Sequence, residues 1–381
     1  MSSVKSAGLD KPLIGLPVRE IRSLAPSIPV QKYGDSPTVK HYTDWSKLLV
    51  IETTDNAERS VSGLLREALN PTLVLSPEGV ENRGSNIEVE ELVNTEDYRW
   101  NIPVENRLQA IHAYRWYRGA RVTLVDDAEI TIYLSPGDGY TGYHLELNVM
   151  DQVKAKITLA IDNTNTVSPQ SSSVLVRAGK GSNVELATIE KSTGASYHYK
   201  HVIMAESANV KSRILASGGD MTRLREDYIL NGENGLGEIH GSSISTGSER
   251  LDLIINTIHK APNTASTLRT RGIVSGRAVV AHRGVARVYS SAEMASVDVE
   301  SFLYVTSRDA RAYSVPVLEV DTGIVESARH STAVMDIPGE IEFYLRQRGL
   351  DRRDIIRLIS HGLLEIVEGY VDLGVLERVY L

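Results

Sequence analysis

The sequence predicts a mainly β protein, built as a β-helix or a related solenoid with helical segments before and after it. Hydrophobic residues make up 41% of the 381 residues but aromatic residues only 6%, so the core must consist mainly of Val, Ile, Leu and Ala, which suit thin stacked β layers. After Gly119, short runs of alternating residues recur behind turns of small or polar residues. Each run is too short to bury its own apolar face, so the runs are expected to stack as successive coils.

The first part of the chain, residues 1–118, is predicted to be extended or helical. Residues 1–48 are rich in Pro, Gly and Ser, and segments such as "PLIGLP" and "PSIPV" are typical of a tail or strap. The patterns "DNAERSVSGLLREALN" (55–70) and "VENRLQAIHAYRWYR" (104–118) each suit a short amphipathic helix. We therefore expect two helices before the first coil.

The parallel β-helix core is predicted over residues 119–335. Its coils are indicated by six alternating runs, at 126–134, 151–159, 181–189, 206–214, 235–243 and 294–301. Their starts lie roughly 24 to 30 residues apart, with one gap of about twice that length, which is within the range of repeat architectures. A β-sandwich is the second choice, but it would need more Asn-Gly hairpin signals and a strand every roughly 8–12 residues.

One stretch of this core, "IHKAPNTASTLRTRGIVSG" (258–276), combines residues that also occur in enzyme clefts. It joins a histidine, a Pro-Asn turn, a run of hydroxyls and two arginines. The recurring pattern predicts that it forms one structural coil. We therefore expect His259 to have a structural role rather than to line a lumen.

A helical region is predicted over residues 336–381. Asp336 and Pro338 mark a helix start, Gly349 is a natural stop, and Asp351 caps a second helix. The apolar positions of the two helices recur at helical spacing: Ile341, Tyr344, Leu345, Ile355, Leu358, Ile359, Leu363, Ile366 and Tyr370.

Gly362 lies inside the second predicted helix, where a glycine costs ~1 kcal/mol relative to alanine. We expect it to allow close packing against a neighbouring segment. The simplest role of the helix pair is to cap the solenoid, because the last coil needs a cover.

Composition excludes several classes of function. The chain has no cysteine, which rules out disulfides, thiolate metal sites and cysteine nucleophiles. The net charge of -8 comes from interspersed charges without a basic stripe, so we expect no nucleic-acid partner. No stretch approaches the ~20 apolar residues of a membrane span, and the first residues lack the apolar core of a signal peptide. We expect a soluble cytoplasmic protein without a membrane partner.

The glycine-rich segments do not match nucleotide-binding patterns. "GLGEIHG" (235–241) has the wrong spacing for a dinucleotide loop, and "GKGS" (179–182) lacks the residue order of a phosphate loop. We therefore expect no nucleotide to be bound by this chain. The sequence also contains no HExxH or GxSxG motif and no paired histidines at metal spacing.

Six segments follow one another in a characteristic order. They are "TRLREDYIL" (222–230), "IHKAPNTAST" (258–267), "HRGVARV" (282–288), "VPVLEV" (315–320), "RHSTAVMDI" (329–337) and "FYLRQRGL" (343–350). In this order the chain resembles the SufB/SufD family, the scaffold component of the Suf iron–sulfur cluster assembly machinery, over residues 104–370. The "HKAPNT" coil is more similar to the SufB branch than to the SufD branch.

The resemblance implies a right-handed parallel β-helix that pairs with a second SufB/SufD-type subunit, either an identical copy or a paralogue. The coils near Ser301–Val320 would lie at the interface, because a β-helix leaves edge groups that must be covered. The resemblance also implies that residues 336–381 dock a SufC-type ABC ATPase. The predicted ATPase contacts are the apolar residues Ile341, Tyr344, Leu345, Ile355, Ile359 and Leu363.

The chain departs from the family at positions that carry its sulfur chemistry. The sulfur-accepting cysteine of SufB proteins corresponds to Ala310, so this chain has no thiolate and cannot accept a persulfide. The family histidine of the "HEAT" or "HGAT" motif corresponds to His330, although Ser331 stands where a Glu often follows. His330 is therefore the candidate ligand of iron or of a transient cluster at the subunit interface. Asp309 is a weaker candidate, if consecutive coils bring it close. On a strand, Arg329 would face away from His330, toward solvent or a carboxylate.

These observations predict a non-catalytic scaffold subunit of an iron–sulfur cluster assembly complex. ATP-driven closure of the ATPase would pull on the helix pair and reorganise the β-helix interface around His330. The alternative is a cytosolic β-helix carbohydrate-active enzyme that uses Asp126, Asp127 or Asp309 in a surface groove. Adjacent Asp126 and Asp127 would point oppositely on a strand and more often form a turn. The sequence leaves open a homodimer or a heterodimer, and the sulfur donor.

Overall fold

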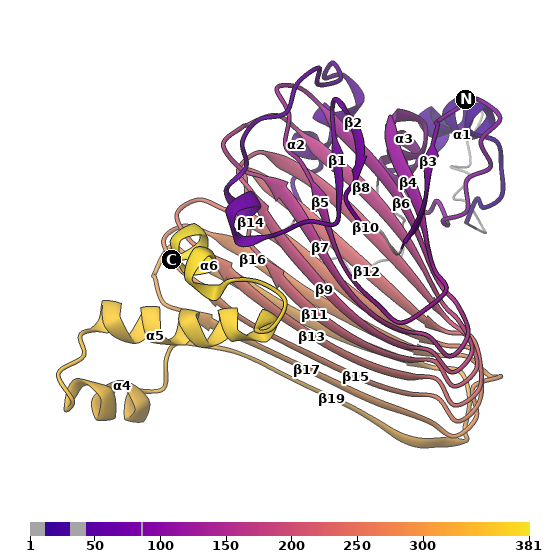
Figure 1. The fold of residues 1–381 in the computed structure, drawn as a ribbon. Helices are drawn as coiled ribbons and strands as arrows, with labels where there is room; N and C mark the ends of the chain where they lie inside the picture. The colour runs from indigo at the N-terminus through magenta and orange to yellow at the C-terminus, as the bar shows by residue number, and fades with distance from the viewer. Residues whose placement is uncertain (1–11, 31–42, 85–86) are drawn as a thin grey trace, which may run out of the picture.

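The chain winds into a parallel β-solenoid that carries helices at both ends (Figure 1). The computed structural model describes residues 12–30, 43–84 and 87–381, so the parts of the predicted tail or strap at 1–11 and 31–42 lie outside the described residues. Strands account for 49% of the structure and helices for 18%. The mainly β class and the parallel solenoid predicted from the sequence are therefore confirmed.

Two sheets face each other across the solenoid, and each rung contributes one strand to each sheet. The first sheet has the order β19-β17-β15-β13-β11-β9-β7-β5-β1-β2, and the second has the order β18-β16-β14-β12-β10-β8-β6-β4-β3. All pairs are parallel except those of β2 and β3, which lie at the N-terminal end. The strands of the first sheet are β1 (Leu73–Ser76), β2 (Gly79–Asn82), β5 (Ala128–Leu134), β7 (Lys154–Asn163), β9 (Asn183–Ser192), β11 (Asn209–Ala216), β13 (Leu236–Ser245), β15 (Ala265–Val274), β17 (Ala295–Val305) and β19 (Val325–Met335). The strands of the second sheet are β3 (Glu88–Leu92), β4 (Arg118–Leu124), β6 (Thr141–Val149), β8 (Gln170–Ala178), β10 (Ala195–Met204), β12 (Met221–Leu230), β14 (Arg250–His259), β16 (Val279–Val288) and β18 (Arg311–Val320).

Side chains that point into the solenoid stack in columns, because neighbouring parallel strands pair residue with residue. One column of the first sheet consists of Ile130, Ile157, Leu186, Ser212, Ile239, Leu268, Val299 and His330. Its members from Ile130 to Val299 are at most 3% exposed. The column therefore forms a continuous, mainly aliphatic core and ends in a histidine on the last rung.

Six of the eight turns from the second sheet into the first pass through one residue in the left-handed region of backbone space. These corner residues are Gln152, Gly181, Ser207, Asn234, Asn263 and Met294, with φ between 55° and 64°. The backbone N–H of each corner residue donates to a carbonyl oxygen of the next rung, for example from Asn263 to Glu293 at 2.9 Å. Because this conformation favours Gly and Asn, small or polar residues recur at one point of the coil.

The stretch 258–276 forms the end of β14, a corner and β15, as predicted for a structural coil. His259 is buried, with Nδ1 2.8 Å from Thr264 Oγ1 and Nε2 2.8 Å from Ser266 Oγ. Burial lowers the pKa of His259 to about 4, which keeps the ring neutral. The structural role predicted for this histidine is confirmed, since it braces the corner.

The six predicted runs all belong to the first sheet, as β5, β7, β9, β11, β13 and β17. The long gap contains β15, whose inward positions include Ser266, Thr270 and Gly272 and so lack a clear apolar signal. The second sheet shows little alternation, because the N-terminal region covers its outer face and both faces of strands such as β10 are buried.

The N-terminal region packs mainly on the outer face of the second sheet, where α2 contacts β10 and α3 contacts β8. Its helices are α1 (Val18–Leu24), η1 (Ala25–Ser27), α2 (Trp45–Leu48), η3 (Leu49–Glu52), η4 (Leu64–Ala68) and α3 (Arg107–Arg115). The helix predicted over 104–118 is confirmed in shorter form by α3. Asn106 precedes the first residue of α3 and caps the helix, because its side chain accepts a hydrogen bond from the Gln109 backbone N–H.

The helix predicted over 55–70 is wrong. Only η4 is helical there, a 3-10 helix of 5 residues. The backbone N–H of Leu64 donates to Thr164 Oγ1 at 2.7 Å, and that of Leu65 donates to Asp162 Oδ2 at 2.9 Å. Hydrogen bonds to the solenoid therefore replace those of a longer helix, so tertiary contacts override the local pattern.

A buried ionic network joins the N-terminal region to the second sheet. Asp252 on β14 is fully buried and accepts hydrogen bonds from Arg223 on β12 and from Arg283 on β16. Thr43 of the N-terminal region donates to the same carboxylate at 2.6 Å. Burial alone would raise the pKa of Asp252, but the two guanidinium groups outweigh burial and hold the pKa below its usual range.

The C-terminal helices are α4 (Gly339–Arg346), α5 (Arg352–Leu364), η5 (Glu365–Val367) and α6 (Leu373–Tyr380). α5, η5 and α6 pack on the outer face of the first sheet, whereas α4 contacts α5 and buries none of its residues (Figure 1). The predicted helix stop at Gly349 is confirmed by its φ of 87°, and Asp351 caps α5 through a capping box. None of the helices in the described ranges is long and apolar enough to cross a lipid bilayer.

The interpretation of these helices as a cap for the last coil is wrong. α5 contacts β13 and β15, η5 contacts β11, and α6 contacts η4. One apolar cluster joins helix residues to outward-facing side chains of the first sheet: Leu363, Leu364, Val367, Leu376 and Tyr380 with Ile189, Leu215, Ile244 and Ile273. α5, η5 and α6 bury their apolar sides against the sheet face, and in the described part of the chain the rung of β18 and β19 stays open.

We predict that Asp252→Ala destabilises the protein by about 3–5 kcal/mol, because it leaves two buried guanidinium groups without their shared carboxylate. Asp321→Ala is the matched control, since Asp321 is 50% exposed and lies 3.7 Å from Arg287. It should change stability by less than about 1 kcal/mol. Urea unfolding followed by circular dichroism measures both, and equal effects would show that the buried network does not hold the two parts together.

Candidate functional site

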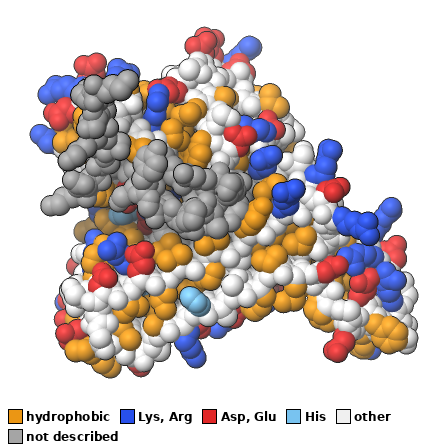
Figure 2. All heavy atoms as spheres, turned by 180° about the vertical axis from the view of Figure 1, so that it is seen from behind, with side chains coloured by type: hydrophobic (Ala, Val, Ile, Leu, Met, Phe, Trp, Pro, Cys, Tyr) orange, Lys and Arg blue, Asp and Glu red, His pale blue; other side chains and the backbone are white. Residues whose placement is uncertain are grey.

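The open last rung of the solenoid is the candidate functional site. Within the described residues, β18 pairs only with β16 and β19 only with β17, so each strand presents one unpaired edge. Exposed apolar side chains surround these edges: Val320, Ile324, Val334 and Met335. Seen from behind, hydrophobic side chains also reach the surface in patches on the lower part of the solenoid (Figure 2). Unpaired edges beside exposed apolar groups are typical of a surface that takes a further chain.

His330 lies in the middle of β19 and continues an inward-facing column beyond Val299. It is exposed because no rung follows it. Arg329 faces the opposite side, where its Nη2 lies 3.8 Å from Asp298 Oδ2, as expected from the alternation of side chains along a strand. The imidazole therefore belongs to the open mouth of the solenoid, and the arginine charge is directed away from it.

Polar side chains that sequence reasoning missed accompany His330 at this mouth. Thr332, the next inward-facing residue of β19, donates a hydrogen bond from Oγ1 to Ser314 Oγ on β18. His282 is paired with Ser314 one rung deeper and is buried, with Nε2 2.8 Å from Ser243 Oγ. Burial lowers the pKa of His282 to about 3, so its ring is neutral. These residues could have been found in the sequence, because polar side chains stand there at inward-facing positions that other strands fill with aliphatic residues.

Asp309 and Ala310 lie in the turn between β17 and β18, away from His330. His330 pairs with Val299 on β17, whereas Asp309 lies beyond Val305, the last residue of β17. The separation between Val299 and Val305 is roughly 20 Å along the strand at ~3.3 Å per residue, so Asp309 is at least that far from His330. The structure does not bring Asp309 to His330. Ala310 is 8% exposed and belongs to the aliphatic core.

The described part of the chain contains no group of three or more His, Asp or Glu side chains that could hold a metal ion. His330 offers one nitrogen ligand at the open rung. A metal or cluster bound there needs its remaining ligands from another chain.

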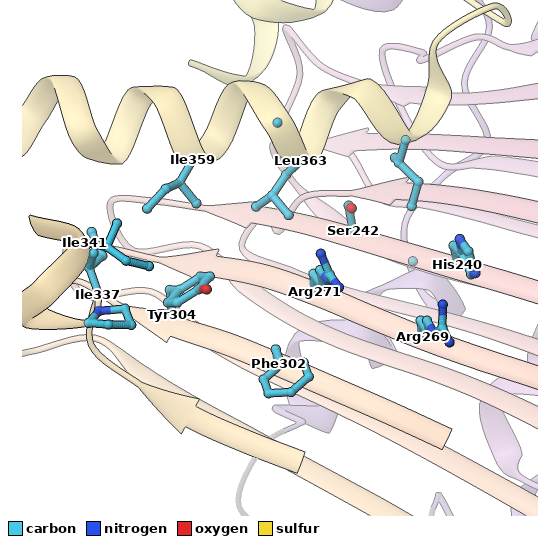
Figure 3. A pocket seen from close by; sticks show the side chains of 14 residues that line it. His240, Ser242, Arg269, Arg271, Phe302, Tyr304, Ile337, Ile341, Ile359 and Leu363 are labelled. Carbon is cyan, nitrogen blue, oxygen red and sulfur yellow. The ribbon is translucent and has the colours of Figure 1, made fainter. Parts of the chain in front are cut away.

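The residues predicted to contact an ATPase divide between buried and exposed positions. On α5, Ile355 and Leu363 are buried in the chain's own core, and Ile359 points toward the first sheet (Figure 3). On α4, Ile341 and Tyr344 are exposed.

The exposed apolar surface of these helices includes residues outside that prediction. Leu345 is half-buried, whereas Phe343 is 66% exposed and Leu358 is 53% exposed. Helical periodicity indicates that one face is buried, but not which apolar residues fall outside the buried face. The exposed apolar surface of this region consists of α4 and the solvent side of α5.

A buried ion pair inside the solenoid was also missed by sequence reasoning. Lys200 Nζ lies 2.8 Å from Glu226 Oε1 and donates to Thr188 Oγ1 at 2.6 Å. Burial lowers the pKa of Lys200, and Glu226 opposes this shift. The adjoining cavity of about 10 Å³ has room for roughly one water molecule. The pair is therefore enclosed and structural.

The carboxylates considered for a carbohydrate-active enzyme do not converge. Asp127 Oδ1 accepts a hydrogen bond from the Lys154 backbone N–H at 2.8 Å in the turn before β5, and Asp126 adjoins it. Asp309 follows β17, and the first-sheet strands from β7 to β15 lie between β5 and β17. Asp309 is therefore separated from Asp127 by roughly 30 Å across the sheet, at ~4.8 Å per strand. Glycoside hydrolysis needs two carboxyl groups within roughly 5–10 Å.

Comparison with known proteins matches residues 136–363 to a family model described as "SUF system FeS cluster assembly, SufBD core domain". Iron–sulfur cluster assembly SufBD family proteins of Staphylococcus saprophyticus and Staphylococcus epidermidis are each 25% identical to the chain over 203 residues, covering 53% of this chain and 43% of each relative. A chloroplastic iron–sulfur cluster assembly SufBD family protein of Arabidopsis thaliana is 23% identical over 194 residues, covering 48% of this chain and 35% of that protein. The matched part of the chain thus spans less than half the length of these relatives.

Proposed function

This chain belongs to the SufBD family of iron–sulfur cluster assembly proteins, and we propose that it is a non-catalytic scaffold subunit of a cluster assembly complex. The observation that carries the proposal is the open last rung, where His330 lies on β19, one of the two strands with an unpaired edge. The cluster is the cargo of this complex and not a resident cofactor of the chain. The carboxylate separations give no support to the alternative of a carbohydrate-active enzyme.

The proposed first partner is a second SufB/SufD-type subunit that covers the open rung. Unpaired backbone groups of β18 and β19 gain hydrogen bonds, and the exposed Val334 and Met335 become buried, when another chain adds strands there. An identical copy or a paralogue would satisfy the same edges. The predicted interface segments at Ser301–Val320 include the β18 edge.

The ligands missing from this chain indicate what the partner supplies. With no cysteine, the chain neither accepts a persulfide nor provides a thiolate to iron. His330 contributes one imidazole nitrogen, and a cysteine-bearing paralogue would add the sulfur ligands. A transient cluster then forms at the interface, held only in part by this subunit.

The proposed second partner is a SufC-type ABC ATPase that docks on α4 and on the solvent side of α5. Exposed Ile341, Phe343, Tyr344 and Leu358 provide an apolar contact surface. Only residues 336–338 separate the end of β19 from the start of α4, so a displacement of α4 acts directly on the strand that carries His330. ATP-driven movement would in this way open or close the cluster site.

The proposed compartment is the cytoplasm, where reducing conditions keep thiol ligands of a partner available for cluster chemistry. No nucleotide is proposed to bind this chain, because ATP would be bound by the ATPase. Neither a nucleic acid nor a membrane is among the proposed partners.

We predict that Phe343→Asp with Leu358→Asp weakens binding of the SufC-type ATPase by at least about tenfold, since two exposed apolar contacts are replaced by charges. Calorimetric titration of the purified chain with the ATPase measures the affinity. The point variants leave the core beneath α5 and α6 intact, which deletion of residues 336–381 would uncover.

The matched control is Val93→Asp with Val167→Asp, because these valines are 67% and 78% exposed and lie outside the C-terminal helices. The control should bind the ATPase like the wild type. Equal affinities of the helix variant and the wild type would exclude this docking surface.

We predict that His330→Ala lowers the iron–sulfur cluster yield of the assembled complex while subunit pairing and ATPase binding persist, because one nitrogen ligand is lost from an otherwise unchanged strand. Anaerobic reconstitution followed by iron and sulfide analysis measures the yield. Arg329→Ala is the control, since its side chain faces Asp298 on the opposite side and the yield should be unaffected. A wild-type yield in an intact His330→Ala complex would show that this histidine is structural.

A further inference from the structure

A groove between α5 and the outer face of the first sheet is used by neither the core nor the open rung. We call it the α5 groove; its volume is about 730 Å³, within the roughly 300–1,000 Å³ range of small-molecule sites. Its floor is formed by outward-facing residues of β13, β15 and β17, its wall by α5, and one end by residues 337–341. Figure 3 shows Ile359 and Leu363 pointing from α5 toward this floor.

One part of the α5 groove is cationic. Arg269 and Arg271 project from β15, and His240 is paired with Arg269 on the neighbouring strand. Arg269 is exposed and has no hydrogen-bond or ion-pair partner among the described residues, and Arg271, 63% exposed, has its nearest carboxylate at Glu300, 3.7 Å away. Arg269 and Arg271 lie two residues apart on the same face of β15. Glu300, which pairs with Arg269 in the register of β17, neutralises only part of their charge, and the excess positive charge favours an anionic group.

The other part of the α5 groove is apolar. Ile337 and Ile341 lie at the end opposite His240 and Arg269, while Phe302 and Tyr304 lie on the floor (Figure 3). Together with Ile359 on the wall they offer aliphatic and aromatic contacts. A ligand that fits both parts has a charged end and an apolar body.

Gly362 provides an independent observation, because it lines the α5 groove from the interior of α5. The close packing expected at this glycine is not present: a Cβ built on it would meet no atom within 4 Å. Glycine inside a helix destabilises it relative to alanine, and packing does not explain it here. The space beside Gly362 is open and adjoins the groove, so a larger side chain at this position would enter it.

We propose that the α5 groove is a binding site for a small organic anion with an apolar body, such as a medium-chain carboxylate or phosphate monoester. The anionic group pairs with Arg269 and Arg271, and the apolar body lies against Phe302 and Ile359. This inference does not rest on the proposed function.

Calorimetric titration of the full chain with decanoate, below its micelle concentration, tests the proposal. The expected result is saturable binding of one decanoate per chain, with weaker binding of decanol and of decyltrimethylammonium. Arg269→Gln with Arg271→Gln should reduce decanoate affinity by at least about tenfold, because charge-assisted hydrogen bonds are lost. Arg353→Gln with Arg357→Gln, on the exposed side of α5, is the matched control and should bind like the wild type.

The Gly362→Leu variant distinguishes loss of decanoate binding from loss of folding, because the two are measured separately. The added side chain enters open space, so the variant should keep or raise the thermal unfolding midpoint and lose decanoate binding. Absence of decanoate binding in the wild type would overturn the proposal. So would equal affinity for decyltrimethylammonium, or wild-type affinity in a folded Gly362→Leu protein.

Discussion

The parallel hydrogen-bond ladder between successive rungs is the constraint on which the rest of the structure depends. It fixes the register, so inward-facing residues stack in columns and a left-handed corner residue recurs in six successive rungs, as at Asn234 and Asn263. Such a ladder has no internal stop, because every new strand exposes another edge. At the N-terminal end the parallel ladder gives way to the short antiparallel strands β2 and β3, whereas at the other end the long parallel strands β18 and β19 end the ladder without a cover in the described residues.

The coverings of the solenoid explain why we propose the open end as the place for another subunit. The second sheet is covered by the N-terminal region, held by the buried network around Asp252, and part of the first sheet is covered by α5 and α6. What is left is an end with two strand edges and, beside it, helix α4 with its apolar residues in solvent. The short link between β19 and α4 places the proposed pairing surface and the proposed ATPase surface next to each other, so one can act on the other.

The fold could be predicted where apolar and polar residues alternate along a strand. Strands of the first sheet alternate because much of their outer face is accessible, whereas strands such as β10 are buried on both faces and give no such signal. For the site, the opposite facing of Arg329 and His330 followed from strand geometry, but the distance to Asp309 did not, since it depends on where β17 ends. Amphipathic spacing indicated the helices, but it could not identify the surface against which Leu363 is buried. Nor could it show that Gly362 borders a groove and makes no close contact.

The central claim is that the last rung is completed by another subunit, and hydrogen exchange of the β18 and β19 backbone amides tests it most directly. The chain alone and the chain assembled with its SufB/SufD-type partner are compared by mass spectrometry of peptides from 311–320 and 325–335. The account predicts slower exchange in both peptides on assembly, with little change in the inner strands β10 and β12, which are already paired on both sides. Equal exchange of the β18 and β19 amides in the isolated and the assembled chain would contradict it.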